Sequence, residues 1–245
     1  MTPYEISDAA LALLIRVLDE GHEQSPQTPD LRSATAAFCY RHGSNVANIG
    51  SDLIFLLTDR RDVGAKMLVR PMVESMFNIG AAFKNQNFAV EKMILEIEKE
   101  VRWLKRDFTN PDQSVLTTIQ QNEAELAHLR QHFGNVIPER RWKYISEIAK
   151  EGGHERHYNK DYRYFCGYTH GDISGMLRHE EGVGRPNVFQ TATMTMLCTA
   201  STLCGVLTVK DQLERLLESR ELNTKLLEAI DNGSIAALDK KEAAH

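Results

Sequence analysis

The apolar residues of this chain recur with a helical period. In one stretch of four turns they lie three and four positions apart, as Val90, Met93, Ile94, Ile97, Val101 and Leu104. No segment shows the alternation of apolar and polar residues that is typical of a half-buried strand, and no Asn-Gly turn joins two apolar runs. The sequence therefore predicts an all-α protein, a single helical bundle with long antiparallel helices.

Capping and breaking residues give the expected helix limits. Thr2-Pro3-Tyr4-Glu5 combines an N-cap, a proline at the first helical position and a capping-box glutamate, and Asn110-Pro111 repeats the device. We expect helices near residues 3–20, 31–58, 62–85, 87–108, 111–133, 138–151, 158–178, 187–219 and 222–231. The polar link at residues 22–30 is too short to separate two domains. We therefore expect one domain over residues 1–231 and a flexible C-terminal tail over residues 232–245.

The net charge, the cysteine content and the absence of known motifs exclude several classes of function. The net charge of −5 argues against a protein coated by nonspecific nucleic-acid binding, although a local basic patch remains compatible with it. The four cysteines form no Cys-x-x-Cys pair, and the first residues lack the basic region of a secretory signal, so we expect a reduced, cytoplasmic protein. Dinucleotide, phosphate-loop and zinc-protease motifs are missing from the sequence, so no cofactor is predicted.

Two segments allow a second interpretation. Residues 186–209 carry no charge and are long enough to span a membrane, but nine hydroxyl or amide side chains favour a buried central helix and no membrane partner. His128 and His132 lie four apart with Glu125 one turn earlier, a spacing that can hold a metal ion. Nothing elsewhere in the sequence completes this ligand set, so we expect no metal site.

Aromatic and basic residues gather between Trp142 and His170. Seven of the chain's eighteen aromatic residues lie there, interleaved with lysines and arginines. Aromatic faces among basic side chains can stack single-stranded bases and hold phosphates. The alternative is that the rings pack a pair of helices while the charges stay in solvent, and the sequence leaves both open.

Within this segment, Arg163 and His170 have a specific spacing. Seven positions put them on one helical face, about 10.5 Å apart along the axis, with Gly167 leaving a gap between them. A phosphate fits such a gap, with Arg163 holding it and His170 exchanging a proton near neutral pH. The alternative is a close helix contact with His170 hydrogen-bonded in the core.

Three earlier polar residues are unusual for a plain core. Arg70 and Glu74 lie one turn apart in an apolar helix, where they can pair, and Pro71 between them is expected to kink or restart that helix. His42 falls on the apolar stripe of its own helix. We interpret His42 as a hydrogen-bonded core residue.

Together these residues resemble a bacterial all-helical domain family of unknown function that is similar to the HEPN superfamily. The resemblance covers roughly residues 30–210 and rests on two motifs: Arg70-Pro71-x-x-Glu74, and Tyr162-Arg163 followed by His170-Gly171. It implies an up-and-down helical bundle that often forms a homodimer. Catalytic HEPN members cut RNA without a metal, through an Arg-x(4–6)-His motif at the dimer interface.

By this resemblance Arg163 would stabilise the phosphate and His170 would assist proton transfer, while Arg70, Glu74, His42 and Tyr162 would be supporting or structural polar residues. The first hypothesis is a metal-independent endoribonuclease, a toxin or phage-defence component, whose partner is RNA. Tyr164 follows the arginine where HEPN nucleases usually carry a polar residue. The alternative is therefore a non-catalytic module that dimerises or binds a nucleotide or protein, with Arg163 and His170 bonded internally to Glu74 or His42.

Overall fold

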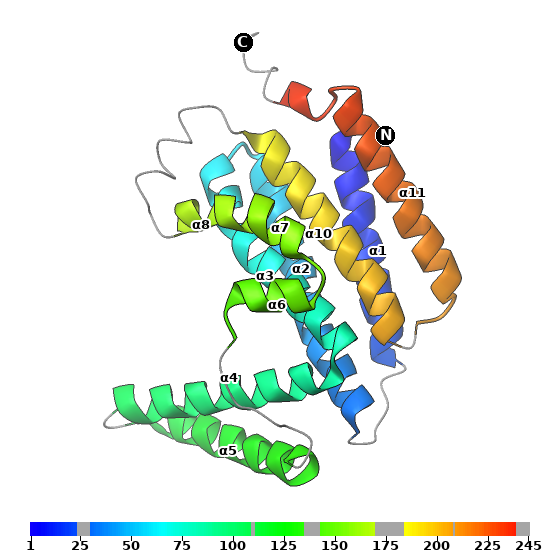
Figure 1. Ribbon diagram of the computed structural model, residues 1–245. Helices are drawn as coiled ribbons and strands as arrows, with labels where there is room; N and C mark the ends of the chain where they lie inside the picture. Colours follow the sequence, from blue (N-terminus) through cyan, green and yellow to red (C-terminus); the bar gives the residue numbers. More distant parts are fainter. Residues whose placement is uncertain (24–29, 109–110, 135–142, 170–183, 208, 239–245) are drawn as a thin grey trace.

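The computed structural model describes residues 1–23, 30–108, 111–134, 143–169, 184–207 and 209–238. These residues form helices and the turns between them, and no strand occurs among them. The predicted all-α class is therefore confirmed (Figure 1).

The helices follow the expected limits closely up to residue 133. Their bounds are α1 (Pro3–Glu23), α2 (Leu31–Thr58), α3 (Asp62–Lys84), α4 (Gln86–Asp107), α5 (Gln113–Phe133), α6 (Ile145–Glu151), α7 (Glu155–His157), a π-helical turn (Tyr158–Tyr162), α8 (Arg163–Thr169), α10 (Arg185–Val206), α11 (Gln212–Asp231) and a 3₁₀ turn (Ala236–Leu238). Residues 138–142 and 170–178, which belong to two of the expected helices, lie outside the described residues.

The single helix expected over residues 187–219 is wrong, as is the separate helix at 222–231. The chain turns between α10 and α11, and Asp211 takes a left-handed conformation with φ 54°. Aspartate tolerates this conformation better than most residues, and the apolar run ends just before it. The turn lets α11 lie beside α10 and α1, as Figure 1 shows.

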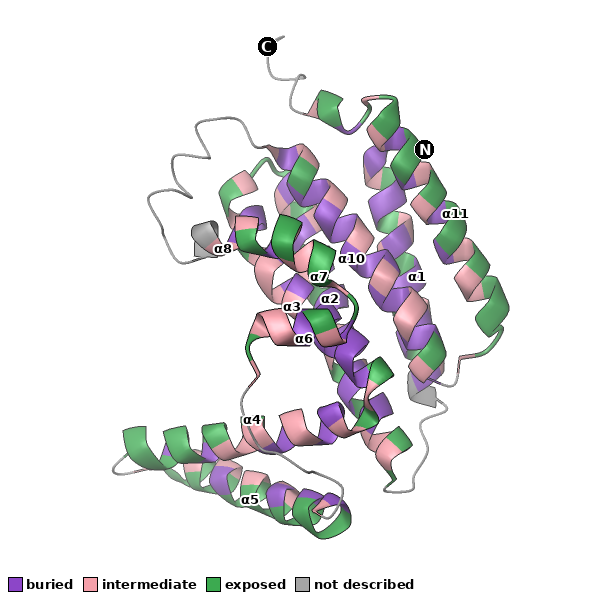
Figure 2. Ribbon diagram, viewed as in Figure 1, coloured by how far each residue is buried: buried purple, intermediate pink, exposed green. Residues whose placement is uncertain are grey.

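The core lies where α1, α2, α3 and α10 face one another, and Figure 2 shows buried residues along these faces. As expected, α10 is a buried central helix. Two of its buried hydroxyls bond to carbonyls one turn back, as Thr193 does to Phe189 and Thr195 to Thr191. Among the described helices, none combines the length and the apolar content that a membrane span requires.

Local capping explains several helix ends. The expected box at the start of α1 is confirmed: Glu5 Oε2 accepts a bond from the Thr2 N–H, and Thr2 Oγ1 accepts one from the Glu5 N–H. At α5 the cap is Asp112, whose Oδ1 accepts from the Val115 N–H at 3.0 Å; Asn110 lies outside the described residues.

Two outer parts complete the fold. The helices α4 and α5 pair as a hairpin that extends from the main bundle (Figure 1). At the other end of the chain Ile235 is buried, and the 3₁₀ turn after it contacts α10. Residues 239–245 of the expected tail lie outside the described residues.

Candidate functional site

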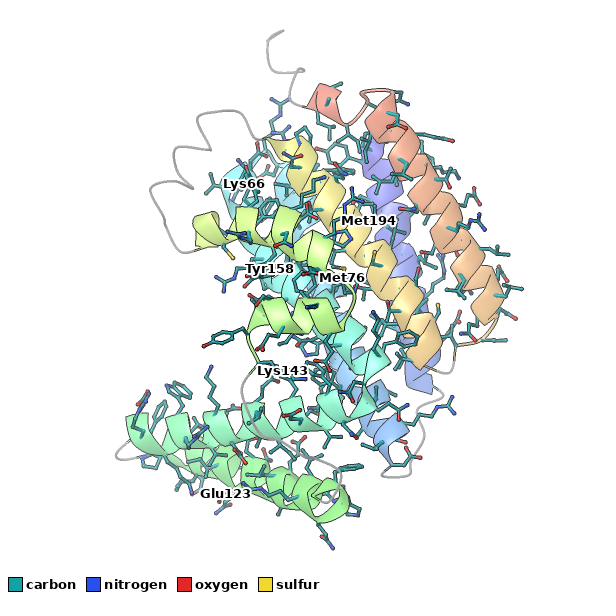
Figure 3. The ribbon with its side chains drawn as sticks, viewed as in Figure 1. Lys66, Met76, Glu123, Lys143, Tyr158 and Met194 are labelled. Atoms are coloured by element: carbon teal, nitrogen blue, oxygen red, sulfur yellow. The ribbon has the colours of Figure 1, made fainter. Side chains whose placement is uncertain are left out.

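A cleft of about 720 Å³ opens between α3, α4 and the residues that begin α6. The α2 helix and the π-helical turn complete its wall. Four residues that the sequence predicts as supporting or structural, and that are spread over 120 positions, all line it: His42, Arg70, Glu74 and Tyr162. Lys143, labelled in Figure 3, lies just before α6 and lines the same cleft.

Arg70, Glu74 and Tyr162 form one hydrogen-bonded group. Glu74 Oε1 accepts a bond from Arg70 Nε at 2.9 Å and a second from the Tyr162 hydroxyl at 2.7 Å. The Arg70 guanidinium also lies 5.6 Å from the centre of the Tyr162 ring. The predicted i, i+4 pair is therefore present, and α3 continues through Pro71 as one helix, so the expected restart there does not occur.

The Tyr162 hydroxyl acts as a hydrogen-bond donor in this group. Tyr162 is 4% exposed, and burial followed by the bond to the Glu74 carboxylate raises its pKa above the usual range of a tyrosine. The hydroxyl therefore stays protonated at neutral pH and keeps Glu74 in place. A bond to a charged acceptor of this kind is stronger than a neutral one.

A π-helical turn sets the position of Tyr162. The Arg163 N–H bonds to the Tyr158 carbonyl, five residues back, instead of four as in an α-helix. The rings of Tyr158 and Tyr162 stack at 5.3 Å, which supports the turn. The extra residue changes which side chains face α3. The expected regular helix from residue 158 is therefore interrupted before α8.

The chain that follows α6 packs closely against α3, because Gly80 on α3 and Gly152 have no side chains at the contact. A Cβ at Gly80 would lie 2.6 Å from His154 Nε2 and 3.1 Å from the Gly152 carbonyl oxygen. Gly153 has φ +79°, a conformation that side-chain-bearing residues rarely adopt. The chain can therefore turn sharply after α6 and pass directly over α3 on its way to Tyr162.

His42 lies in the wall of the cleft, partly exposed, and not in the closed core where the sequence places it. Burial, and then the nearby charge of Lys92, lower its pKa to about 4. The imidazole is therefore neutral at pH 7. It packs edge-on to Phe38 at 4.5 Å and makes no hydrogen bond with a described residue, so the expected core bond is wrong within that part of the chain.

Arg163 does not line the cleft. It is exposed at the start of α8, and within the described part of the chain its side chain has no hydrogen bond or ion pair. The bond from Arg163 to Glu74 or His42 expected of a non-catalytic module is absent there; Glu74 is bonded to Arg70 and Tyr162 instead. His170 and Gly171 lie outside the described residues, so the structure does not show where the imidazole is.

The most informative residue that sequence reasoning missed is Asn78. It lines the cleft, is 7% exposed, and its Oδ1 has no hydrogen-bond partner in the described structure. A signal existed in the sequence: Arg70, Glu74 and Asn78 follow one another at intervals of four on α3 and form one polar stripe in an apolar helix.

The cleft is also lined by charges and aromatic rings, of which Lys143 and Tyr144 belong to the aromatic and basic segment that the sequence singles out, whereas the residues of α4 were not expected. Its lysines are Lys92, Lys99 and Lys143, its further carboxylates are Glu96 and Glu100, and its exposed rings are Trp103 and Tyr144. Lys143 Nζ lies 2.6 Å from Glu151 Oε2 and is held there by α6. Such a surface suits a polar ligand with a planar ring.

The described residues contain no group of three His, Cys, Asp or Glu side chains that could hold a metal ion. His128 and His132 lie with their ring centres 4.2 Å apart, and His132 Nδ1 is 2.9 Å from the His128 carbonyl oxygen. This contact uses the ring nitrogen within the helix itself.

Comparison with known proteins gives one match. No curated protein and no solved structure is similar enough to this chain to be matched. The model of a family of unknown function, DUF5677, matches residues 39–184, which include α2 from Cys39 onward, the cleft and α8. Because this match covers more than half of the chain, the protein belongs to the DUF5677 family.

Proposed function

We propose that this protein is a metal-independent endoribonuclease of the HEPN type, in which Arg163 binds the scissile phosphate and His170 transfers a proton. The observation that supports this most is the exposed Arg163 guanidinium, which has no ion-pair partner among the described residues. An arginine in that state is ready to bind an anion, and its planar group matches two oxygens of one phosphate.

The backbone that carries Arg163 is well anchored. The residue before it, Tyr162, is bonded to Glu74 on α3, and the ring of Tyr158 stacks on Tyr162. Arg163 therefore projects from a fixed point, which lowers the entropy lost when a phosphate is bound. In this proposal Arg70, Glu74 and Tyr162 act as positioning residues and do not contact the reacting atoms.

The proposed reaction needs no cofactor. The ribose 2′-oxygen attacks the adjacent phosphorus and loses its proton, and the bond from phosphorus to the 5′-oxygen breaks as that oxygen gains a proton. The products are a 2′,3′-cyclic phosphate and a 5′-hydroxyl. His170 carries one of the two protons, and Arg163 stabilises the charge that develops on the phosphate oxygens. The proposal includes a homodimer that brings two such motifs together, as in a toxin or a phage-defence nuclease.

The test is RNA cleavage by the purified chain in the presence of EDTA. We expect labelled single-stranded RNA to be cut by the wild-type protein and to stay intact with His170→Ala. Size-exclusion chromatography with light scattering gives the oligomeric state of both. RNA that stays intact with the wild type, or a His170→Ala variant as active as the wild type, would contradict the proposal.

A non-catalytic binding module is the second candidate. The observation in its favour is the cleft, whose wall contains a buried amide oxygen without a partner. Wild-type protein that leaves RNA intact but binds a small ligand in this cleft would support the module over the nuclease.

A further inference from the structure

The cleft has buried neutral residues and exposed aromatic rings among its lining, and its charged side chains range from the enclosed Lys92, 12% exposed, to the exposed Lys99. Its most buried polar residues are Ser75 and Asn78, which are neutral, and His42 lies near them as a neutral imidazole. Tyr144 and Trp103 at the rim are 73% and 47% exposed. The inner wall therefore offers neutral hydrogen-bonding groups, and the rim offers aromatic faces and charges.

On the inner wall the Ser75 hydroxyl has hydrogen-bond partners, whereas the Asn78 side-chain oxygen has none among the described residues. The Ser75 hydroxyl donates to the Pro71 carbonyl and accepts from Asn45 Nδ2. Asn78 Oδ1 is shielded from solvent without a partner among the described residues. Buried polar atoms are nearly always paired, so an unpaired one at a cleft wall points to a ligand group that is absent. The amide can turn about its Cβ–Cγ bond to present this oxygen to the cleft.

The rim supplies the other two contacts that a nucleotide needs. An exposed ring such as Tyr144 can stack on a base, whatever the base is, because every base has an aromatic face. Lysine ammonium groups bind phosphate as compact charges, and Lys99 and Lys143 both line the rim. The cleft volume lies within the range that holds one small organic ligand.

We propose that this cleft binds a mononucleotide, with the base inward against Asn78, one face of it on Tyr144, and the phosphate outward at Lys99 and Lys143. The site is separate from the proposed RNA-cleaving motif, because Arg163 does not line the cleft. The inference therefore goes beyond RNA cleavage and stands whether or not the protein cuts RNA.

Isothermal titration calorimetry of the 245-residue chain tests this, with AMP, GMP, CMP, UMP, the four nucleosides and inorganic phosphate as probes. We expect at least one nucleotide to bind, its nucleoside to bind more weakly, and phosphate alone to give no binding. The Asn78→Leu change should weaken binding about tenfold, since one hydrogen bond to the base is lost. Lys99→Met should weaken binding of the nucleotide but leave binding of the nucleoside unchanged.

Asn223→Leu is the matched control. Asn223 on α11 also has a buried Oδ1 without a partner, but it lies outside the cleft, so this variant should bind as the wild type does. If Asn78→Leu fails to fold, Tyr144→Ala replaces it, because an exposed ring can be removed without loss of the fold; about tenfold weaker binding is expected there too.

Three results would overturn the inference: no nucleotide bound at millimolar concentration, phosphate bound as tightly as the nucleotide, or equal effects of Asn78→Leu and Asn223→Leu. The two proposals fail separately. His170→Ala should abolish RNA cleavage and keep nucleotide binding, whereas Asn78→Leu should weaken nucleotide binding and leave RNA cleavage unchanged.

Discussion

The Tyr162 hydroxyl donates a hydrogen bond of 2.7 Å to Glu74 Oε1, although the two residues lie 88 positions apart in the sequence. This bond ties the π-helical turn to α3. It also fixes the start of α8, where Arg163 lies, and one wall of the cleft. The stability of this contact therefore matters for both proposed sites.

Removing the hydroxyl tests this contact. Tyr162→Phe should lower the free energy of unfolding by about 1–2 kcal/mol, because a bond to a carboxylate is lost while the ring stays. Urea denaturation gives the value. Tyr158→Phe is the control, since the Tyr158 ring is in contact but its hydroxyl has no bond with a described residue. Equal losses in the two variants would show that the Tyr162–Glu74 bond contributes nothing.

Asn78 should behave differently from a structural polar residue. Asn78→Leu is expected to keep or raise the free energy of unfolding, by up to about 1 kcal/mol, because a buried unpaired oxygen is removed. Asn45→Ala, which breaks a bond to Ser75, should lower it by about 1 kcal/mol. The same urea experiment compares them. A large decrease in the free energy of unfolding of Asn78→Leu would mean that the Asn78 amide already has hydrogen-bond partners in the fold.

Two glycines on α3 give opposite predictions for the same substitution. Gly80→Ala should lower the free energy of unfolding by about 1–3 kcal/mol, because its Cβ would meet His154 and the Gly152 carbonyl. Gly64→Ala should raise it by about 0.5–1 kcal/mol, since its Cβ would lie 3.4 Å from Leu56 in ordinary contact. Thermal unfolding measures both changes. Changes of the same sign would contradict the close passage of residues 152–154 over α3.

The fold should lose stability between pH 6.5 and pH 4. Burial lowers the pKa of His42 and of His154 to about 4, with Lys92 adding to the effect at His42 and His157 and Lys84 adding to it at His154. Both histidines therefore bind protons in the unfolded chain before the folded one does. The contribution of the two histidines to the free energy of unfolding is complete above pH 6.5. It falls as the pH decreases, for each histidine by at most about 1.4 kcal/mol per pH unit.

Urea unfolding at pH 7, 6 and 5 checks this sign, and the variants His42→Gln and His154→Gln should each flatten the dependence. His128→Gln is the control, because His128 is exposed on α5. A pH dependence of the unfolding free energy that is unchanged in both His42→Gln and His154→Gln would show that folding does not lower the pKa of either histidine.

The sequence predicts helices well where a cap marks the end. The expected helix at residues 31–58 matches α2, and Asp30 Oδ1 accepts from the Ser33 N–H at its start. The break at Asp211 and the π-helical turn at Tyr158–Tyr162 were not predicted. Both features change only a few backbone angles. The spacing of apolar residues in these two segments still fits a continuous helix, so the spacing alone does not reveal them.

The site could be predicted in part. The pairing of Arg70 with Glu74 follows from their spacing on one helix, and the structure has it. The approach of Tyr162 depends on packing between segments far apart in the chain, for which no local pattern exists. Asn78 continues the polar stripe of Arg70 and Glu74, so its place could have been inferred, but the missing partner of its oxygen is a property of the folded protein.

In the proposed nuclease the Arg163 side chain binds the phosphate at which RNA is cut. The rate of RNA cleavage in EDTA, measured for Arg163→Ala and Arg156→Ala at saturating RNA, tests it most directly. Arg156 is the matched control, because it is an exposed arginine on the neighbouring helix α7. We expect a cleavage rate about 10²–10³-fold lower for Arg163→Ala and an unchanged rate for Arg156→Ala. Equal rates for the wild type and the two variants would contradict it.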